Sequence, residues 1–365
     1  MRKKPVIKSL VASQNDVNQI ESAGAAMLPE LRRLIEGAQT RVAVAVNSEL
    51  VLLYWDLGHR IRTEILREER AEYGERIVQT VSDKLSAEFG KGYSRPNLVY
   101  MMKFAEHFPD RQICQTLSTK LSWSHFSEIL RLKTPLEREF YATLCHKSGW
   151  SVRGLRREIA GALFTRTALA SKGEDVILAD LEKLRDEDKW TPDLVLRDPY
   201  VLSFLGLTDS FSEADLEAAI LREMERFLLE LGEGFTFAAR QKRMTIDGKD
   251  FYLDLLFYHR HLRRLVAIDL KIGPFEPGFK GQMELYLAWL NKYERARGEE
   301  APIGLVLCTE AGREQMALLQ IGQNDIHVAE YITQHLPPEL LERKLREAQT
   351  RSADQLAARE KGDER

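Results

Sequence analysis

The sequence has little cysteine, no long apolar run and almost no net charge. Its three cysteines, Cys114, Cys145 and Cys308, are far apart and form no C-x-x-C pair, which argues against a disulfide framework or a zinc site. No apolar stretch approaches the ~20 residues of a membrane span, and Lys8 interrupts the apolar run near the start. A net charge of -3 gives no global attraction to nucleic acid, so such binding must come from local basic patches. We therefore expect a cytoplasmic protein in a reducing compartment, without a membrane anchor.

Residues 16–166 have the pattern of a helical domain. A chain of 365 residues, 44% hydrophobic and 30% charged, is long enough for two domains of ordinary size. Over residues 48–62 apolar side chains recur every three or four positions, which predicts an amphipathic helix with a broad buried face. Similar segments follow as far as residue 166, so the first domain should be mainly α-helical.

A helix, a glycine turn and a second helix follow one another over residues 77–108. Gly90 and Gly92 end the first helix, and Ser94 with Pro96 begins the second. This outline is compatible with a helix-turn-helix, whose second helix would present four polar side chains to a duplex. These side chains are Arg95, Asn97, Tyr100 and Lys103. Two packed helices with a solvated polar face explain the same pattern and are favoured on this evidence alone.

The composition changes after the helical domain. Residues 167–193 are acidic with a short apolar patch, and we expect a connector containing at most one short helix. Residues 194–335 form the expected second domain. Residues 336–365 are rich in arginine and glutamate and predict a charged helical tail that ends in disorder.

The second domain is expected to begin with a helix over residues 212–231, which carries one misplaced charge. Ser212 and Asp215 have the spacing of a capping box, and Gly232 ends the helix. At 100° per residue the apolar side chains fall on one arc, and Glu217 lies inside that arc. A carboxylate on a buried face needs a partner. Glu213 lies on the same side, but its place in the first turn is explained by the helix dipole.

Residues 251–271 read as two apolar strands around a basic turn, with three charges set into them. Asp269 and Lys271 share one face of the second strand because side chains alternate. If the turn is centred between His261 and Leu262, Asp254 faces Asp269. Two carboxylates side by side in an apolar sheet repel each other unless a cation lies between them, and a divalent metal resolves the conflict.

The expected order of elements in the second domain is helix, three strands, helix, strand. A strand over residues 235–246 precedes the two above, and Asp247 with Gly248 makes the turn between them. A helix over 279–293, an apolar strand over 303–308, a helix over 312–319 and a strand over 327–332 follow. A strand–helix–strand crossover in one sheet implies a mixed α/β sandwich.

This αβββαβ arrangement, with Glu217 on the helix and Asp254 and Asp269-Leu270-Lys271 on the strands, resembles the PD-(D/E)XK nuclease fold of restriction endonucleases. Asp254 lacks the preceding proline of that motif. The chain also resembles the bacterial DUF1016 or YhcG family over residues 16–335. That likeness is carried by NSELVLLYW (47–55), GYSRPNLVYMMKFAEHFPD (92–110), RDPYVLSFLGL (197–207), LLELGEGFTFAARQ (228–241) and the segment 251–283.

The resemblance implies a metal-dependent nuclease that cuts phosphodiester bonds, of DNA rather than RNA, and is targeted by its N-terminal domain. Mg²⁺, or Mn²⁺ in its place, would bind Asp254, Asp269 and the Leu270 carbonyl, with Glu217 as an outer or second-metal ligand. Lys271 would orient or deprotonate the attacking water and stabilise negative charge. Supporting roles fall to Gln241, Gln282, Arg240 and Lys280.

Other interpretations of these residues stay open. The Asp-x-Lys pattern of Asp269 and Lys271 occurs by chance in many proteins, and a simple ion pair at a strand edge also explains it. His259 and His261 have the spacing of metal ligands, but a solvated turn beside arginines is favoured, and Arg260 and Arg263 there are candidates for contact with a DNA backbone. The whole protein could be a non-catalytic nucleic-acid-binding or assembly protein with a nuclease-like fold, or an adaptor for other proteins. A homodimer is compatible with cutting both strands of a duplex.

Overall fold

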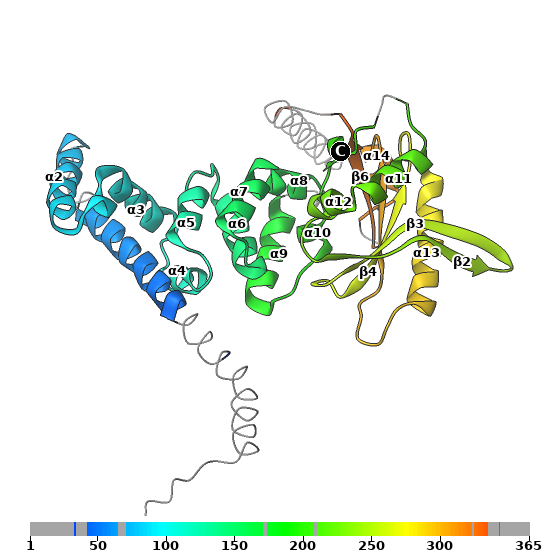
Figure 1. Cartoon of the computed structure of the whole chain (residues 1–365), viewed down its shortest axis with the longest axis horizontal. Coiled ribbons are helices and arrows are strands. Elements are labelled where there is room, and N and C mark those ends of the chain that lie inside the picture. The colour runs from blue at the N-terminus through cyan, green and yellow to red at the C-terminus, as the bar shows by residue number, and fades with distance from the viewer. Residues whose placement is uncertain are drawn as a thin grey trace, which may run out of the picture. The chain divides into compact units, whose positions relative to one another are not determined.

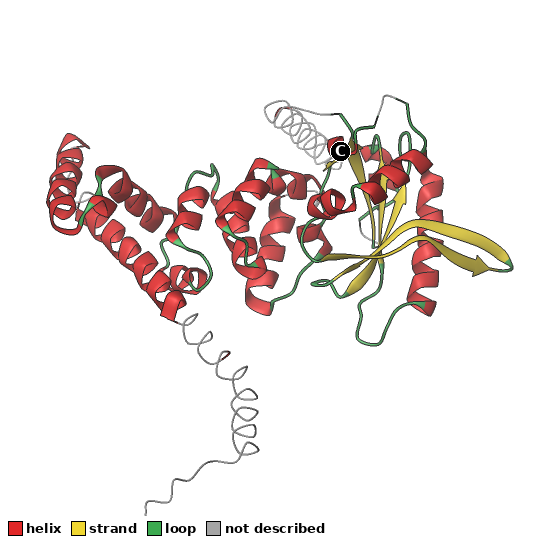
Figure 2. Ribbon diagram, viewed as in Figure 1, coloured by secondary structure: helices red, strands yellow, loops and turns green. Residues whose placement is uncertain are grey.

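The computed structural model describes residues 42–64, 71–170, 174–207, 210–322 and 325–334, together with Arg33 and Arg343. The chain divides into two compact units, residues 1–131 and 132–365. The described part of the first is helical, and the second combines helices with a β-sheet (Figures 1 and 2). No helix within these ranges is long and apolar enough to cross a membrane. The expected tail over 336–365 and the start of the chain lie outside the described residues, Arg343 apart.

The first unit packs a helix over 42–64 against several shorter ones. Gly58 lies so close to the neighbouring helix that a Cβ there would be 1.9 Å from the carbonyl oxygen of Met101. The Trp55 indole N–H donates to the carbonyl of Phe108 at 2.7 Å. The helix predicted over 48–62 is therefore confirmed. The other elements in the described part of this unit are α2 (Ala71–Phe89), the short helix η1 (Lys91–Tyr93), α3 (Arg95–His107), α4 (Arg111–Ser118) and α5 (Trp123–Ile129).

The second unit begins with five helices that pack together. They are α6 (Pro135–Ser148), α7 (Val152–Ala160), α8 (Leu163–Ala170), α9 (Glu174–Glu187) and α10 (Pro192–Val195). Helix α9 lies within the segment expected to be a connector. Its side chains Ile177, Leu181 and Leu184 are fully buried, and Asp180 accepts a hydrogen bond from Thr191 at 2.7 Å. These three aliphatic side chains recur at positions i, i+4 and i+7, which is the pattern of an amphipathic helix. The acidic composition of the segment made this pattern easy to overlook. The described part of residues 167–193 is thus packed structure.

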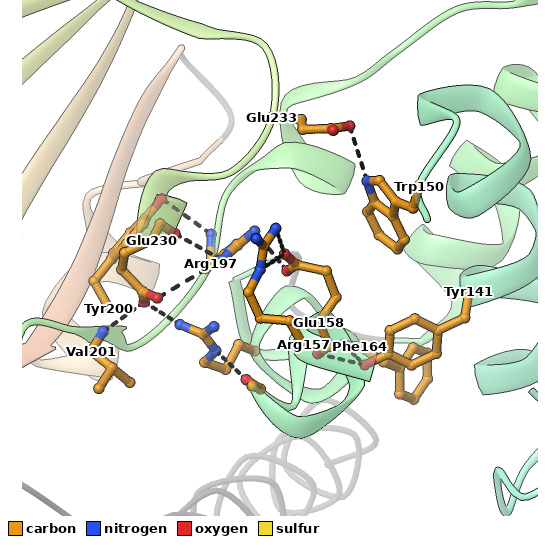
Figure 3. Close-up of polar contacts among 12 residues, drawn as sticks. Tyr141, Trp150, Arg157, Glu158, Phe164, Arg197, Tyr200, Val201, Glu230 and Glu233 are labelled. Atoms are coloured by element: carbon orange, nitrogen blue, oxygen red, sulfur yellow. Dashed lines mark hydrogen bonds and ion pairs between the residues drawn. The ribbon is translucent and has the colours of Figure 1, made fainter. Parts of the chain in front are cut away.

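A buried cluster of four charges joins these helices to the rest of the unit (Figure 3). Arg197 donates to Glu158 of α7 at 3.3 Å and to the backbone carbonyl of Glu230 at 2.7 Å. The Glu230 carboxylate pairs with Arg166 of α8 and accepts the backbone N–H of Val201 at 2.7 Å. Two arginines and two glutamates balance each other, which is the condition for burying charge at tolerable free energy. The cluster thereby fixes α7 and α8 to the helix that carries Glu230.

Six strands form the sheet of this unit, in the order β1-β6-β5-β4-β3-β2. They are β1 (Tyr200–Val201), β2 (Phe235–Ile246), β3 (Lys249–His259), β4 (Arg264–Leu270), β5 (Ile303–Cys308) and β6 (Ile326–Ile332). The ladders β2–β3 and β3–β4 are antiparallel, and β4–β5, β5–β6 and β6–β1 are parallel. The mixed sheet expected from the order of elements is confirmed. The predicted hairpin register is also confirmed, because Leu255 pairs with Ile268 and His259 with Arg264.

Helices cover both faces of the sheet. Helices α11 (Glu213–Arg222) and α12 (Met224–Leu231) bury Leu216, Ile220 and Phe227 against one face. Helix α13 (Pro277–Tyr293) buries Met283 and Leu290 against the other, and α14 (Arg313–Leu318) links β5 to β6. This layered arrangement buries the apolar residues of β4 and β5 on both sides, as their nearly continuous hydrophobic sequence requires.

The single helix expected over residues 212–231 is in fact two. Glu223 leaves helical geometry, with φ −105° and ψ 31°, and separates α11 from α12. The capping box at its start is confirmed, since the Ser212 hydroxyl accepts the Asp215 N–H and the Asp215 carboxylate accepts the Ser212 N–H. A helical wheel assumes an unbroken helix and contains no information about such a break.

The turn between β3 and β4 is less solvated than expected. The imidazole of His259 is fully buried; its Nδ1 accepts the Leu262 N–H at 3.1 Å, which leaves Nε2 to donate to the Glu233 carbonyl. Burial lowers the pKa of His259 to about 4. Gly234 makes room for this ring, because a Cβ there would lie 2.8 Å from Nε2. The assignment of His259 to a solvated tip was therefore wrong, and the ring is part of the core.

Candidate active site

The strands separate at the point where the predicted carboxylates lie. The ladder between β3 and β4 ends with the pair Leu255–Ile268, and Asp254 is the next residue of β3. Beyond this fork β3 continues to pair with β2, while β4 pairs with β5. The Asp254 carboxylate accepts the backbone N–H of Leu270 at 2.8 Å, so a side chain takes over where the ladder stops. The fork thereby places Asp254 against the segment 269–271.

Asp269 is buried at the end of β4 and contacts two charged groups. Its side chain is 3% exposed, and the Lys271 ammonium lies 2.9 Å from its Oδ2. Burial raises the pKa of Asp269 to about 6, against the opposing effect of Lys271 and with a further increase from the Asp254 carboxylate. Two carboxyl groups that share a site in this way resist ionising together. The predicted juxtaposition of Asp254 and Asp269 is present in the structure.

Lys271 is held in its charged form. Burial alone would lower its pKa, but the hydrogen bond and negative charge of Asp269 outweigh it, and the pKa of Lys271 is raised. The ammonium also lies 5.2 Å from the ring centre of Phe279 on α13. A lysine in this state donates hydrogen bonds and offers positive charge.

Gln241 connects Glu217 to Asp254. Its Nε2 donates to Glu217 on α11 at 2.6 Å and to Asp254 at 3.1 Å. Glu217 is half-buried, and the partner that its place on the helix demanded is this amide. Gln241 has φ +43° in the middle of β2, a left-handed conformation that costs a non-glycine residue about 1–3 kcal/mol. A strained backbone that holds two carboxylates is typical of functional sites.

Glu213 also belongs to this cluster, although its position in the first helical turn was ascribed to the helix dipole. Its carboxylate accepts the backbone N–H of Ile272 at 3.2 Å, and its charge helps to raise the pKa of Lys271. The sequence did contain a signal, since Glu213 and Glu217 are four residues apart and therefore lie on one side of α11.

The remaining residues predicted to support the site make no direct contact with Asp254 or Asp269 among the interactions of the described residues. Gln282 donates to the Tyr286 hydroxyl at 2.6 Å, and that hydroxyl donates to the backbone carbonyl of Tyr252. Lys280 pairs with Glu284 at 3.3 Å, and Arg240 is exposed on β2.

The basic residues of the β3–β4 turn lie at the opposite end of the hairpin. Arg260 follows the end of β3 and is six positions from Asp254 along the chain, a distance of about 20 Å. Arg260 is exposed, and Arg263 pairs with Glu300 at 3.3 Å. These arginines are therefore not part of the cluster at the fork.

The four residues of the expected recognition helix all lie on α3 of the first unit. Arg95 and Lys103 are exposed. The Asn97 amide donates to the Gly92 carbonyl at 3.0 Å, and Tyr100 is hydrogen-bonded to Arg131. The Asn97 and Tyr100 side chains thus make structural contacts within the unit.

The oxygen donors at the fork suit a hard divalent cation such as Mg²⁺. Two of the predicted ligands, Asp254 and Asp269, meet directly, whereas the Gln241 amide lies between Glu217 and Asp254. Within the described ranges no three His, Cys, Asp or Glu side chains are grouped closely enough to hold a metal ion. In this arrangement Lys271 and Gln241 supply the positive charge and the donors that the carboxylates require.

Comparisons with known proteins identify the family of this chain. Residues 30–166 match the DUF1016 N-terminal domain, and residues 193–346 match the YhcG PDDEXK nuclease domain. The chain is 36% identical to a protein of Escherichia coli (strain K12) named "Putative nuclease YhcG", over 84% of this chain and 89% of that protein. The chain belongs to the YhcG family. The resemblance noted in its motifs is thereby confirmed, as is the nuclease-like fold of its second domain.

A solved structure of a repair endonuclease from Pyrococcus abyssi is also similar to this chain. It matches with 19% identity and a TM-score of 0.24, over 36% of this chain and 50% of its own. A likeness of that size has no bearing on the site of this YhcG-family member.

Proposed function

We propose that this protein is a metal-dependent nuclease that hydrolyses phosphodiester bonds, of DNA in preference to RNA. The observation that carries the proposal is the pair Asp254 and Asp269 at the fork, with the pKa of Asp269 raised to about 6 and Lys271 alongside. A fold under no functional demand has no reason to set a half-buried carboxylate against a buried one beside a strained glutamine.

Asp254 and Asp269, with the Leu270 carbonyl, would hold Mg²⁺ or Mn²⁺, and Glu217 would complete the set once released from Gln241. When bound, the ion neutralises charge on the scissile phosphate and lowers the pKa of a bound water. Lys271, which is protonated, would orient that water and donate hydrogen bonds to the phosphate oxygens as negative charge develops. Gln241 would fix the orientation of Asp254.

We also propose that the N-terminal helical domain, residues 16–166, targets the nuclease domain, residues 194–335, to its substrate. Exposed Arg95 and Lys103 on α3 offer positive charge for a phosphate backbone. We further propose that α3 serves as the recognition helix of a helix-turn-helix, that the protein acts as a homodimer, and that it is located in the cytoplasm.

The test is cleavage of supercoiled, linear, branched and single-stranded DNA and of RNA by the purified full chain with Mg²⁺ or Mn²⁺. Asp269→Ala and Lys271→Ala should be inactive while still folded, and Asp186→Ala, an exposed change on α9, should cut like the wild type. Cutting that survives both site changes would show a contaminant or another site. Binding without cutting by the wild type would favour the alternative of a non-catalytic nucleic-acid-binding protein.

A further inference from the structure

The hairpin of β2 and β3 continues well past the fork. Residues 242–253, here called the hairpin arm, pair only with each other, because β3 contacts β4 only from Leu255 onward. Figure 1 shows this hairpin projecting beyond the other strands. An isolated two-stranded hairpin is marginally stable, so one face of the arm needs support.

Helix α13 supports one face of the arm. Met244 and Leu253 are fully buried in the core that α13 covers. On the same side the Lys242 ammonium lies 2.7 Å from Glu294 and 5.9 Å from the Trp289 ring centre. Because side chains alternate along a strand, the neighbouring positions of the arm point away from α13.

The other side of the arm, here called the open face, consists of Arg243, Thr245, Asp250 and Tyr252. These residues form two cross-strand pairs, Arg243 with Tyr252 and Thr245 with Asp250. Tyr252 is 50% exposed, and the Arg243 side chain is 64% exposed. A half-exposed aromatic ring beside an exposed guanidinium offers a stacking surface next to a positive charge, which are the two groups that bind a single strand of nucleic acid.

The open face begins next to the candidate active site. Tyr252 is two residues from Asp254, about 7 Å along the strand, and Arg243 is two residues from Gln241. A substrate whose phosphate lies at the fork would therefore extend along the arm. The arm contains three basic and two acidic side chains, and Arg240 just before it adds a fourth positive charge, in a chain of net charge -3. This segment therefore favours a polyanion.

The one acidic residue of the open face is held by weak contacts. The Asp250 carboxylate accepts from Arg243 and from the Thr245 hydroxyl, each at 2.8 Å. An exposed ion pair of this kind contributes little to stability. A phosphate group could therefore replace Asp250 on the Arg243 guanidinium without disturbing the hairpin.

We propose that the open face binds an unpaired strand of nucleic acid beside the active site, with Tyr252 stacked on a base and Arg243 on a phosphate. Aromatic rings bind single strands by stacking and tolerate any base. Inside a duplex the bases are already stacked on each other, so the arm directs the site to single-stranded, flapped or branched substrates. This inference rests on the proposed nuclease function, whose substrate it narrows.

The experiment measures binding of a short fluorescein-labelled single strand, and of its blunt duplex, to the full chain by fluorescence anisotropy with Ca²⁺ in place of Mg²⁺. Tyr252→Ala should weaken single-strand binding about tenfold or more and duplex binding much less. Arg243→Ala should weaken binding and reduce the slope of log K against log salt by about one. Asp250→Asn should tighten binding, because it frees Arg243 and removes a negative charge.

Tyr293→Ala is the matched control, since Tyr293 at the end of α13 is 60% exposed and lies off the open face. Tyr252→Trp keeps a stacking ring and should bind as the wild type does, which separates loss of stacking from loss of folding. Equal effects of Tyr252→Ala and Tyr293→Ala, weaker binding by Asp250→Asn, or no single-strand binding by the wild type would each overturn the proposal.

The cleavage assay distinguishes this inference from the function beneath it. If the wild type cuts and Tyr252→Ala neither binds nor cuts differently, the nuclease stands and the open face has no role. If the wild type cuts nothing but Tyr252→Ala still loses single-strand binding, the open face binds nucleic acid in a protein that is not a nuclease.

Discussion

Replacing Asp269 by asparagine should stabilise the folded protein while it abolishes cutting. Burial raises the pKa of Asp269 from 3.8 to about 6. At neutral pH the folded state therefore holds an ionised carboxylate whose charge costs more free energy than it does in the unfolded state. A difference of about two pKa units corresponds to ~3 kcal/mol. Asparagine resembles the protonated carboxyl, and the attraction of Lys271 is already contained in the raised pKa. We therefore expect an increase of about 1–3 kcal/mol in the free energy of unfolding, with ~3 as the upper bound.

The pH dependence gives this prediction its sign. Between the unfolded pKa of 3.8 and the folded pKa of about 6, the folded state binds more protons than the unfolded state. The stability due to Asp269 is therefore fully present below 3.8 and is lost as the pH rises through about 6. Wild type and Asp269→Asn should be equally stable at the acid end of this window and differ most above it.

The assay is equilibrium unfolding in urea with EDTA, followed by tryptophan fluorescence, at several values across this range. Asp186→Asn on the exposed side of α9 is the control and should shift the midpoint little at any pH. Adding Mg²⁺ should stabilise the wild type and not Asp269→Asn, because only the wild type has the ligand. An Asp269→Asn variant less stable than the wild type at neutral pH in EDTA would refute the reasoning.

Two further predictions concern the buried ionic cluster and the strained glutamine. Glu230→Ala removes one of two negative charges facing Arg166 and Arg197 and should lower the free energy of unfolding by about 3–5 kcal/mol. Glu223→Ala breaks a partly exposed pair with Arg226 and should change it by less than about 1 kcal/mol. Urea midpoints that move equally would contradict this account. Gln241→Gly and Gln241→Ala should both slow cutting, because both lose the side-chain amide. The glycine variant should nevertheless be more stable than the alanine variant by about 1–2 kcal/mol, because only glycine adopts φ +43° without strain. Equal stabilities would show that the backbone is not strained.

The predictable parts of this structure are those governed by local rules. Asp254 and Asp269 meet because one turn sets the register of a hairpin, and a shift of one residue would turn every side chain to the wrong face. The helix start at Ser212 follows from two side chains three residues apart. Each of these required only a few neighbouring positions of the sequence.

The parts that were missed depend on contacts between distant positions. His259 is buried because Gly234, 25 residues earlier, leaves space for its ring. The left-handed conformation of Gln241 and its two carboxylate partners arise only once β2, β3 and α11 are assembled. Composition suggested a connector where α9 packs, since acidic residues on its outer side outnumber the few leucines on its inner side.

The fork concentrates negative charge that does not contribute to the stability of the fold. Glu213, Asp254 and Asp269 act on one ammonium, that of Lys271, and Glu217 is joined to Asp254 through the Gln241 amide. These carboxylates accept hydrogen bonds from Gln241, from the backbone N–H groups of Leu270 and Ile272 and from Lys271. The raised pKa of Asp269 nevertheless shows that the folded state would be more stable with one negative charge fewer. Groups that reduce stability persist where they serve a task that stability does not. An excess of carboxylate at the edge of a sheet, next to a protonated lysine and a projecting basic hairpin, is what binding a cation and a phosphate together would require.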